Sequence, residues 1–444
     1  MWSHKALNAQ AGVVLATIIA VLLAACGPKE APGAKPATSS GQPAAVSSGP
    51  TLAPVAKSES VKPDTSAAPA AKNYKLPDVI NWVTLDVGSA TYNVHQAIAH
   101  GTSGREKNTI RLIPTGTDLG RLAIYKDGRA DFGNDPGIYA SEGITFYSDK
   151  EAGPTDVRLI AINWPKTNQL VGCAGDLGIK EPKDLKGRRM VYVSNSFGFN
   201  LNMEATLAAG NLTWEDVKRV DIPSYGGAGR AIMEDKADCV WTATNTGFVY
   251  EMANSPRGYS PVYMKTQQED PEMWSRFLKV NPAGTPGKAT VGAPPISEEN
   301  PHYGNGPHFG TISTLSSKDA EYVYAMTKAI YEAFPEFNGS YPGVEGLASD
   351  RVRFDQIFSP VHDGSIRYFK EKGWWTDAAE KRQQELLKRE PVLKAAWEKS
   401  LADPQGKSLQ GDDWARFWAK QRADGLKAAG LDPYWEDAFW LRLL

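Results

Sequence analysis

The chain has 444 residues, of which 41% are hydrophobic and 23% charged, and its formal net charge at pH 7 is −2. It has no basic patch and no interleaving of basic with aromatic residues, so nucleic acid is not an expected partner. Three cysteines without zinc-type pairs, six scattered histidines and the lack of phosphate-loop, nucleophile-elbow or zinc-protease motifs predict no metal, no cofactor and no enzymatic activity.

The first 26 residues have the pattern of a lipoprotein signal peptide. After a short basic start, residues 11–25 form an almost unbroken apolar run that ends in Leu23-Ala24-Ala25-Cys26. Such a run suits a signal peptide and falls short of the roughly 20 residues that a membrane-spanning helix needs. The tetrapeptide resembles the lipobox of bacterial lipoproteins, which implies lipidation at Cys26 and a periplasmic protein anchored to a membrane. An uncleaved anchor and an ordinary secretory signal are the alternatives.

Residues 27–76 are predicted to be a disordered linker. They are dominated by Ala, Pro, Ser, Gly and Lys, and they contain no aromatic residue before Tyr74. Such a segment buries too little apolar surface to offset the entropy of ordering it. We expect it to hold the folded body away from the bilayer.

The body begins with a strand that leads into a helix. Residues 80–87 are predicted to form the strand, residues 88–93 the loop, and the helical pattern continues through Ile98. Ser89 and Thr91 lie where the helix begins, and a helix start attracts an anion because it carries about half a positive charge. Simple capping of the helix by either hydroxyl is the alternative interpretation.

The same strand-then-helix order repeats along the first part of the body. A strand at 110–113 precedes a hydroxyl-rich turn at 114–118 and a helix at 119–127, and a turn with a short strand at 128–133 runs into Asn134. Strands that alternate with helices predict a parallel sheet, and ligands of such sheets bind beyond the carboxyl ends of the strands.

A second set of alternating elements follows a strand at 157–162. Its predicted strands are 169–173, 190–193, 217–222 and 239–242, and its predicted helices are 200–209 and 230–234. Two similar α/β lobes in tandem indicate a cleft between them.

Six sequence elements, taken in order, resemble the TAXI-type solute-binding proteins of TRAP (tripartite ATP-independent periplasmic) transporters. The resemblance covers roughly residues 80–375. The elements are 85–92, Thr115-Gly116-Thr117-Asp118 with 128–133, Leu177-Gly178-Ile179 with 184–187 and Met190-Val191, Ser196-Phe197-Gly198 with 207–212, 235–241, and 362–369.

The resemblance implies an α/β, two-lobe periplasmic-binding-protein fold of the type II-like class. The expected ranges are 77–165 for the first lobe, 166–281 for the second, and 282–375 for the return to the first with hinge-packing segments. Residues 376–444 lie beyond the resemblance, and their own pattern predicts a helical C-terminal extension. It also implies capture of a small organic anion, such as a dicarboxylate, keto acid or acidic amino acid, and its delivery to a TRAP-type permease. The alternatives are service to an ABC importer or a sensory receptor, and an envelope enzyme or scaffold on the same fold.

The candidate ligand contacts are donors to a carboxylate at the expected cleft. From the first lobe they are Ser89, Thr91, Tyr92, Thr115, Thr117 and Asn134, and from the second they are Asn195, Ser196, Tyr225, Thr242 and Arg230. A surface pairing with Glu234 is the alternative for Arg230. We expect structural roles for four further residues: an ion pair for Arg367, turn bracing for Asp118 and Asp131, and packing for His362.

The extension is rich in tryptophan, and its predicted helices are 378–388, 392–401, 414–429 and 435–443. We expect its aromatic residues to pack the extension onto a lobe, and a surface for a partner or a membrane is the alternative. Cys173 and Cys239 fall on predicted strands of the second lobe. The sequence leaves open whether they form a disulfide or remain two buried thiols.

Overall fold

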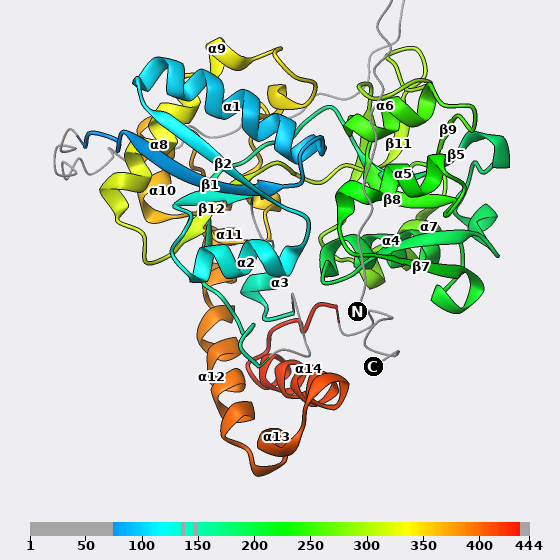
Figure 1. Ribbon diagram of the computed structural model, residues 1–444. Coiled ribbons are helices and arrows are strands. Elements are labelled where there is room, and N and C mark those ends of the chain that lie inside the picture. The colour runs from blue at the N-terminus through cyan, green and yellow to red at the C-terminus, as the bar shows by residue number, and fades with distance from the viewer. Residues whose placement is uncertain (1–73, 135–137, 145–149, 436–444) are drawn as a thin grey trace, which may run out of the picture. The chain divides into compact units, whose positions relative to one another are not determined.

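The computed structural model describes residues 74–134, 138–144 and 150–435 (Figure 1). These residues belong to one compact unit, 68–444. The predicted signal peptide, most of the predicted linker and Cys26 lie outside the described residues, as does nearly all of the helix expected at 435–443.

The first sheet has the strand order β2-β1-β3-β12-β4. Strand β1 is parallel to β2 and β3, whereas β12 is antiparallel to β3 and β4. Its strands are β1 (Val79–Leu85), β2 (Thr109–Thr115), β3 (Phe132–Asn134), β4 (Val157–Ala161) and β12 (Ile312–Leu315). The helices of the same lobe are α1 (Ala90–Glu106), α2 (Asp118–Lys126), α3 (Ile138–Ser141), α8 (Ala320–Glu332), α9 (Phe334–Phe337) and α10 (Asp363–Glu371).

Apolar side chains explain why these elements form a layered lobe. Ile80, Trp82 and Val83 of β1 are all fully buried, so both faces of this central strand are covered. A parallel sheet buried on both faces is typical of α/β folds, in which the crossover helices cover it. Val94 and Ile98 of α1 contribute to the same core.

The second sheet has the order β10-β11-β5-β8-β6-β7, with β9 paired to β5. Its strands are β5 (Gln169–Ala174), β6 (Arg189–Val193), β7 (Lys218–Ile222), β8 (Cys239–Ala243), β9 (Tyr259–Pro261), β10 (Pro286–Ala289) and β11 (His302–Asn305). Its helices are α4 (Phe197–Ala209), α5 (Ala228–Met233), α6 (Gly247–Ala253) and α7 (Pro271–Val280). Each strand and helix expected between 169 and 242 is present, within a few residues of the expected bounds.

The second sheet extends further along the chain than the sequence indicated. Strands β10 and β11 pair with each other, and Asn305 pairs with Gln169 of β5. We therefore propose that the return to the first lobe, expected at residue 282, lies between Asn305 and Ile312. The two strands are only four residues long and rich in Gly and Pro, so they carry no alternating apolar pattern.

The structure joins Cys173 and Cys239 in a disulfide with an S–S distance of 2.06 Å. The two residues face each other on the antiparallel strands β5 and β8, and their Cα atoms are 4.0 Å apart. Of the two possibilities that the sequence left open, the structure contains the disulfide.

The C-terminal extension is helical and packs on the body. It comprises α11 (Asp377–Leu387), α12 (Arg389–Ala402), α13 (Pro404–Ser408) and α14 (Gly411–Ala428). Trp414, Trp418 and Trp435 are buried in an apolar cluster that includes Leu201 of α4 and Trp274 of α7. The expectation that tail aromatics pack on a lobe is therefore confirmed for these three residues.

Two sheets with flanking helices and a helical extension confirm the predicted fold class, a type II-like periplasmic-binding-protein fold. Within the part of the chain that the structure describes, no helix is both long and apolar enough to span a membrane.

Candidate functional site

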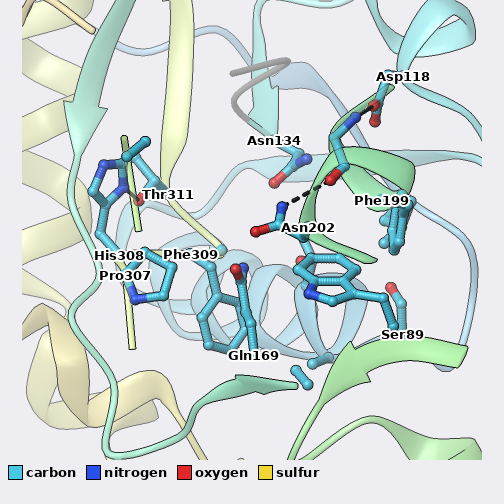
Figure 2. A pocket seen from close by; sticks show the side chains of 18 of the residues that line it. Ser89, Asp118, Asn134, Gln169, Phe199, Asn202, Pro307, His308, Phe309 and Thr311 are labelled. Atoms are coloured by element: carbon cyan, nitrogen blue, oxygen red, sulfur yellow. Dashed lines mark hydrogen bonds between the residues drawn. The ribbon is translucent and has the colours of Figure 1, made fainter. Parts of the chain in front are cut away.

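A cavity of about 190 Å³ lies between the two lobes, at the carboxyl ends of their parallel strands (Figure 2). A dry cavity of about 150 Å³ admits a benzene ring, so this one suits a small solute of roughly six to ten non-hydrogen atoms. Ligands of open α/β sheets bind at this edge of the strands. The cavity is therefore the candidate binding site.

The lining combines aromatic rings with neutral polar groups. The rings come from Tyr139, Phe199, Tyr225, Trp241, Phe309 and Phe358. The side-chain amides come from Asn134, Gln169, Asn202, Asn281 and Asn305, and the hydroxyls from Ser89, Thr91, Thr246, Thr311 and Ser359. Polar groups set among apolar walls are typical of a small-molecule site, because the walls exclude water and the polar groups orient the ligand.

Three helices begin at the cavity wall. They contribute Ala90 and Thr91 of α1, Asp118 of α2, and Gly198 and Phe199 of α4 to the lining. Each helix start carries a partial positive charge, so three starts at one cavity favour an anionic group there.

One buried ion pair also lines the cavity. Arg121 donates to Asp118 Oδ1, and both side chains are almost fully buried. An Nη of Arg121 also donates to the Thr117 carbonyl at 3.3 Å, whereas its buried Nε has no partner among the described residues. Arg121 thus supplies a charged donor group at a site where its charge is already balanced by Asp118.

The ionisable rings in the cavity are neutral at physiological pH. Burial lowers the pKa of His308 to about 4, and its Nδ1 lies 3.1 Å from Thr311 Oγ1. Burial raises the pKa of Tyr225 to about 12, and its hydroxyl lies 2.8 Å from Thr242 Oγ1. Neither ring brings a charge to the ligand.

Two carboxylates of the first lobe accept hydrogen bonds from the second lobe, one at the cavity and the other at a second opening. Asp118 Oδ2 accepts the Gly198 N–H at 2.8 Å, and Asp86 Oδ2 accepts the Gly226 N–H at 2.8 Å. The structure therefore has the two lobes in contact around the cavity.

Four of the predicted contacts line the cavity: Ser89, Thr91, Asn134 and Tyr225. Ser89 has a second role, since its Oγ accepts the Tyr92 N–H at 3.0 Å and caps α1. Figure 2 labels Asn134 and Asn202, which both line the cavity.

The other seven predicted contacts do not line the cavity. They are Tyr92, Thr115, Thr117, Asn195, Ser196, Thr242 and Arg230. Besides Thr242, which contacts Tyr225, three of the hydroxyls have partners within the protein. Thr117 caps α2 by accepting the Gly120 N–H at 3.1 Å, Thr115 donates to the Thr84 carbonyl at 3.4 Å, and Ser196 accepts the Asp118 N–H at 3.3 Å.

Arg230 lines the second opening, of about 240 Å³, together with Asp86, Ser89 and Tyr225. Glu234, its expected surface partner, is paired with Lys236 at 2.6 Å.

The structural roles expected for four residues agree with the contacts. Arg367 forms a two-pronged ion pair with Glu321 at 2.5 and 2.9 Å. Asp131 accepts the Asn81 N–H at 3.3 Å, and His362 Nδ1 accepts the Gly364 N–H at 3.1 Å. Asp118 braces the start of α4, but it also lines the cavity, which the sequence did not indicate.

Sequence reasoning missed the amide network. Asn202 Oδ1 accepts an N–H from Asn281 at 2.8 Å, and Asn202 Nδ2 donates to the Gly198 carbonyl at 2.7 Å. Asn202 is buried in the middle of helix α4, where asparagine is unfavourable. This misfit was a usable signal, whereas Asn281 and Asn305 lie in segments with no readable pattern. The described residues contain no group of three or more His, Cys, Asp or Glu side chains that would hold a metal ion.

Comparison with known proteins gives the family. Residues 84–373 match the model of the NMT1-like family, and the chain belongs to that family. This range falls inside the stretch over which the sequence resembles TAXI-type proteins.

Several solved structures are similar over long stretches at low identity. One is the alkanesulfonate-binding protein SsuA from Xanthomonas axonopodis pv. citri bound to MOPS, with 14% identity, 69% of this chain and 83% of that chain covered, and a TM-score of 0.35. Another is a protein of Bordetella bronchiseptica RB50, with 18% identity, 83% and 99% covered, and a TM-score of 0.38. A third is an ABC transporter/periplasmic binding protein from Brucella ovis with glutathione bound, with 13% identity, 78% and 84% covered, and a TM-score of 0.37.

Proposed function

We propose that the protein captures a small carboxylate-bearing solute in the cavity between its lobes and delivers it to a membrane permease without chemical turnover. The observation that carries this proposal is the small cavity on which the starts of α1, α2 and α4 converge. The solute would be a dicarboxylate, a keto acid or an acidic amino acid.

The proposed contacts divide between charge recognition and shape recognition. Ser89, Thr91 and the start of α1 would hold a carboxylate, and the Arg121 guanidinium, which also lines the cavity, would add positive charge beside it. Asn134 and Asn202 would bind a second polar group, and the aromatic walls would enclose the carbon skeleton. A charged donor improves an anion site more than a neutral one does, because hydrogen bonds to charged groups are stronger.

The proposed mechanism is closure around the solute. A ligand favours the closed state only by contacts that it makes there and not in the open state. The Asp86 and Asp118 contacts with the second lobe would belong to the closed state, and the contacts of the solute would add to them.

The proposed location is the periplasm, with lipidated Cys26 as the membrane anchor. The buried Cys173–Cys239 disulfide supports an oxidising compartment, since disulfides persist there and are rare in the cytosol. Substituting Cys26 by serine should abolish incorporation of labelled palmitate, and labelling that persists would refute the anchor.

The proposed partner is a TRAP-type permease, which the resemblance to TAXI-type proteins supports, and an ABC importer is the alternative. Uptake by cells that express the protein with its permease separates the two. A TRAP system keeps importing solute when ATP is depleted and an ion gradient is maintained, whereas an ABC system stops.

The binding proposal is tested by thermal melting of the mature protein with organic acids, amino acids and neutral sugars, followed by calorimetry. An acid at 100 times its dissociation constant should raise the free energy of unfolding by about 2.7 kcal/mol. A melting shift with a neutral or cationic solute, and with no acid, would refute the anion claim. Consumption of the bound acid would refute the absence of turnover.

A further inference from the structure

Two residues of the cavity wall are supported from behind by the C-terminal extension. The first is Tyr139 of α3, whose ring meets the Trp435 ring edge-to-face at a centroid distance of 5.8 Å. On another side, the Tyr139 ring meets Phe197 edge-to-face at 5.1 Å. Phe197 is the first residue of α4, so Tyr139 connects the extension to the second lobe.

The second wall residue is Phe358. The Arg382 guanidinium of α11 lies over its ring at 4.8 Å, and Arg382 Nε donates to the Ile357 carbonyl at 2.7 Å. The Tyr434 ring, which follows α14, lies 6.0 Å from the Phe358 ring. The extension therefore contacts the wall at two separate places.

A buried charge cluster fixes the extension beside Tyr139. Glu142 follows α3, and its two carboxylate oxygens accept from Arg389 of α12 at 2.6 and 2.9 Å. Arg422 of α14 donates to the same carboxylate. The three side chains are only 5%, 6% and 2% exposed, respectively. Burial alone would raise the pKa of Glu142, but the two arginines hold it below its usual value.

The same two arginines hold the chain that carries Tyr434 and Trp435. Arg389 donates to the Asp432 carbonyl at 2.7 Å, and Arg422 donates to the carbonyls of Pro433 and Tyr434 at 2.6 and 3.0 Å. Figure 1 shows this last described segment, in red, running from α14 toward α3. One cluster thus joins α3, α12, α14 and the segment that touches the cavity wall.

We propose that the C-terminal extension helps to set the solute affinity of the cavity. Arg389 and Arg422 position the wall residue Tyr139 through Glu142 and Trp435. This inference rests on the proposed function. The extension supports Tyr139 and Phe358 on their outer sides, and Tyr139 in turn supports the start of α4. Solute affinity then depends on residues that do not line the cavity.

A second ion pair between the extension and the first lobe provides a matched control. Arg158 of β4 donates to Glu390 of α12 at 2.5 and 2.8 Å. Neither residue lines the cavity. Arg158→Met therefore loosens the extension without reaching the wall, whereas Arg422→Met releases the segment next to Tyr139. Because Arg389 still neutralises Glu142 in the Arg422→Met protein, no buried carboxylate is left without a partner.

The experiment compares wild type, Arg422→Met and Arg158→Met as full-length mature proteins. Hydrogen–deuterium exchange is followed in residues 138–144, where the Ile144 N–H bonds to the Tyr139 carbonyl at 2.8 Å, and in residues 195–199 of the second lobe. Calorimetry then measures the dissociation constants of L-glutamate, 2-oxoglutarate and succinate, well below each variant's melting temperature.

We expect Arg422→Met to speed exchange at least tenfold in both segments and to raise the dissociation constant of the bound acid at least tenfold. In Arg158→Met both quantities should stay within twofold of wild type. If Arg422→Met does not fold, Trp435→Leu takes its place, since it removes the ring against Tyr139 and leaves the charge cluster intact.

Equal effects in the two variants, or faster exchange at 138–144 with none at 195–199, would overturn the proposal. If exchange responds as expected and none of the three acids binds wild type, the positioning role stands and the proposed ligand class fails. An unchanged dissociation constant in Arg422→Met, for an acid that wild type binds, would also overturn the proposal.

Discussion

Thr117→Val separates a hydroxyl that caps a helix from one that binds solute. Thr117 Oγ1 accepts the Gly120 N–H at 3.1 Å, and the residue is not among those that line the cavity. Valine keeps the volume and the β-branch but leaves this N–H at the start of α2 without its acceptor. Loss of such a cap costs about 0.5–2 kcal/mol of unfolding free energy.

Thr91→Val is the matched comparison, because Thr91 also lies at a helix start but faces the cavity. If its hydroxyl donates to a carboxylate, its loss costs about 1.5–3 kcal/mol of binding free energy, or roughly ten- to a hundredfold in affinity. Its effect on unfolding should stay within about 0.5 kcal/mol, as for most substitutions that break no cap.

Denaturant unfolding and calorimetry on both variants give the two free energies. We expect Thr117→Val to lower stability and leave the dissociation constant within twofold, and Thr91→Val to do the reverse. A dissociation constant raised tenfold or more by Thr117→Val would refute the reasoning, because it would place that hydroxyl in the site despite its capping contact.

Three further predictions concern pH, the disulfide and the cleft contacts. Burial lowers the pKa of His95, His302 and His308 to about 4. The unfolded chain therefore takes up these protons first, near pH 6.5. The free energy of unfolding should therefore be highest above pH 6.5 and fall as the pH approaches 4. A denaturation midpoint that rises on acidification would contradict this. Replacing both Cys173 and Cys239 by alanine opens a link with a sequence separation of 66 and should lower the free energy of unfolding by about 2–5 kcal/mol, measured by denaturant melts. Asp86→Asn should weaken the contact with the Gly226 N–H, and small-angle scattering without ligand should report a larger radius of gyration; an unchanged radius would remove Asp86 from closure.

The local pattern of the sequence was enough to predict most strands and helices of the two lobes. Apolar residues and the turns that follow them placed β1, β2 and the strands from β4 to β8, because strand positions that face a core favour apolar side chains and a helix start needs an oxygen acceptor. The same local chemistry placed Ser89 and Thr91 at the start of α1. It did not reveal β10 and β11, whose short Gly- and Pro-containing segments have no alternation to read.

What faces the cavity was decided by the tertiary structure. Ser89 and Thr117 both cap the start of a helix, yet only Ser89 also lines the cavity, and the orientation of α1 and α2 around the cleft decides this difference. Asn202 and Asn281 meet across 79 positions of sequence, and Glu142 meets Arg422 across 280. Neighbours along the chain constrain a residue's backbone and its capping, but contacts between distant segments depend on how the elements pack, and no short stretch of sequence specifies that packing.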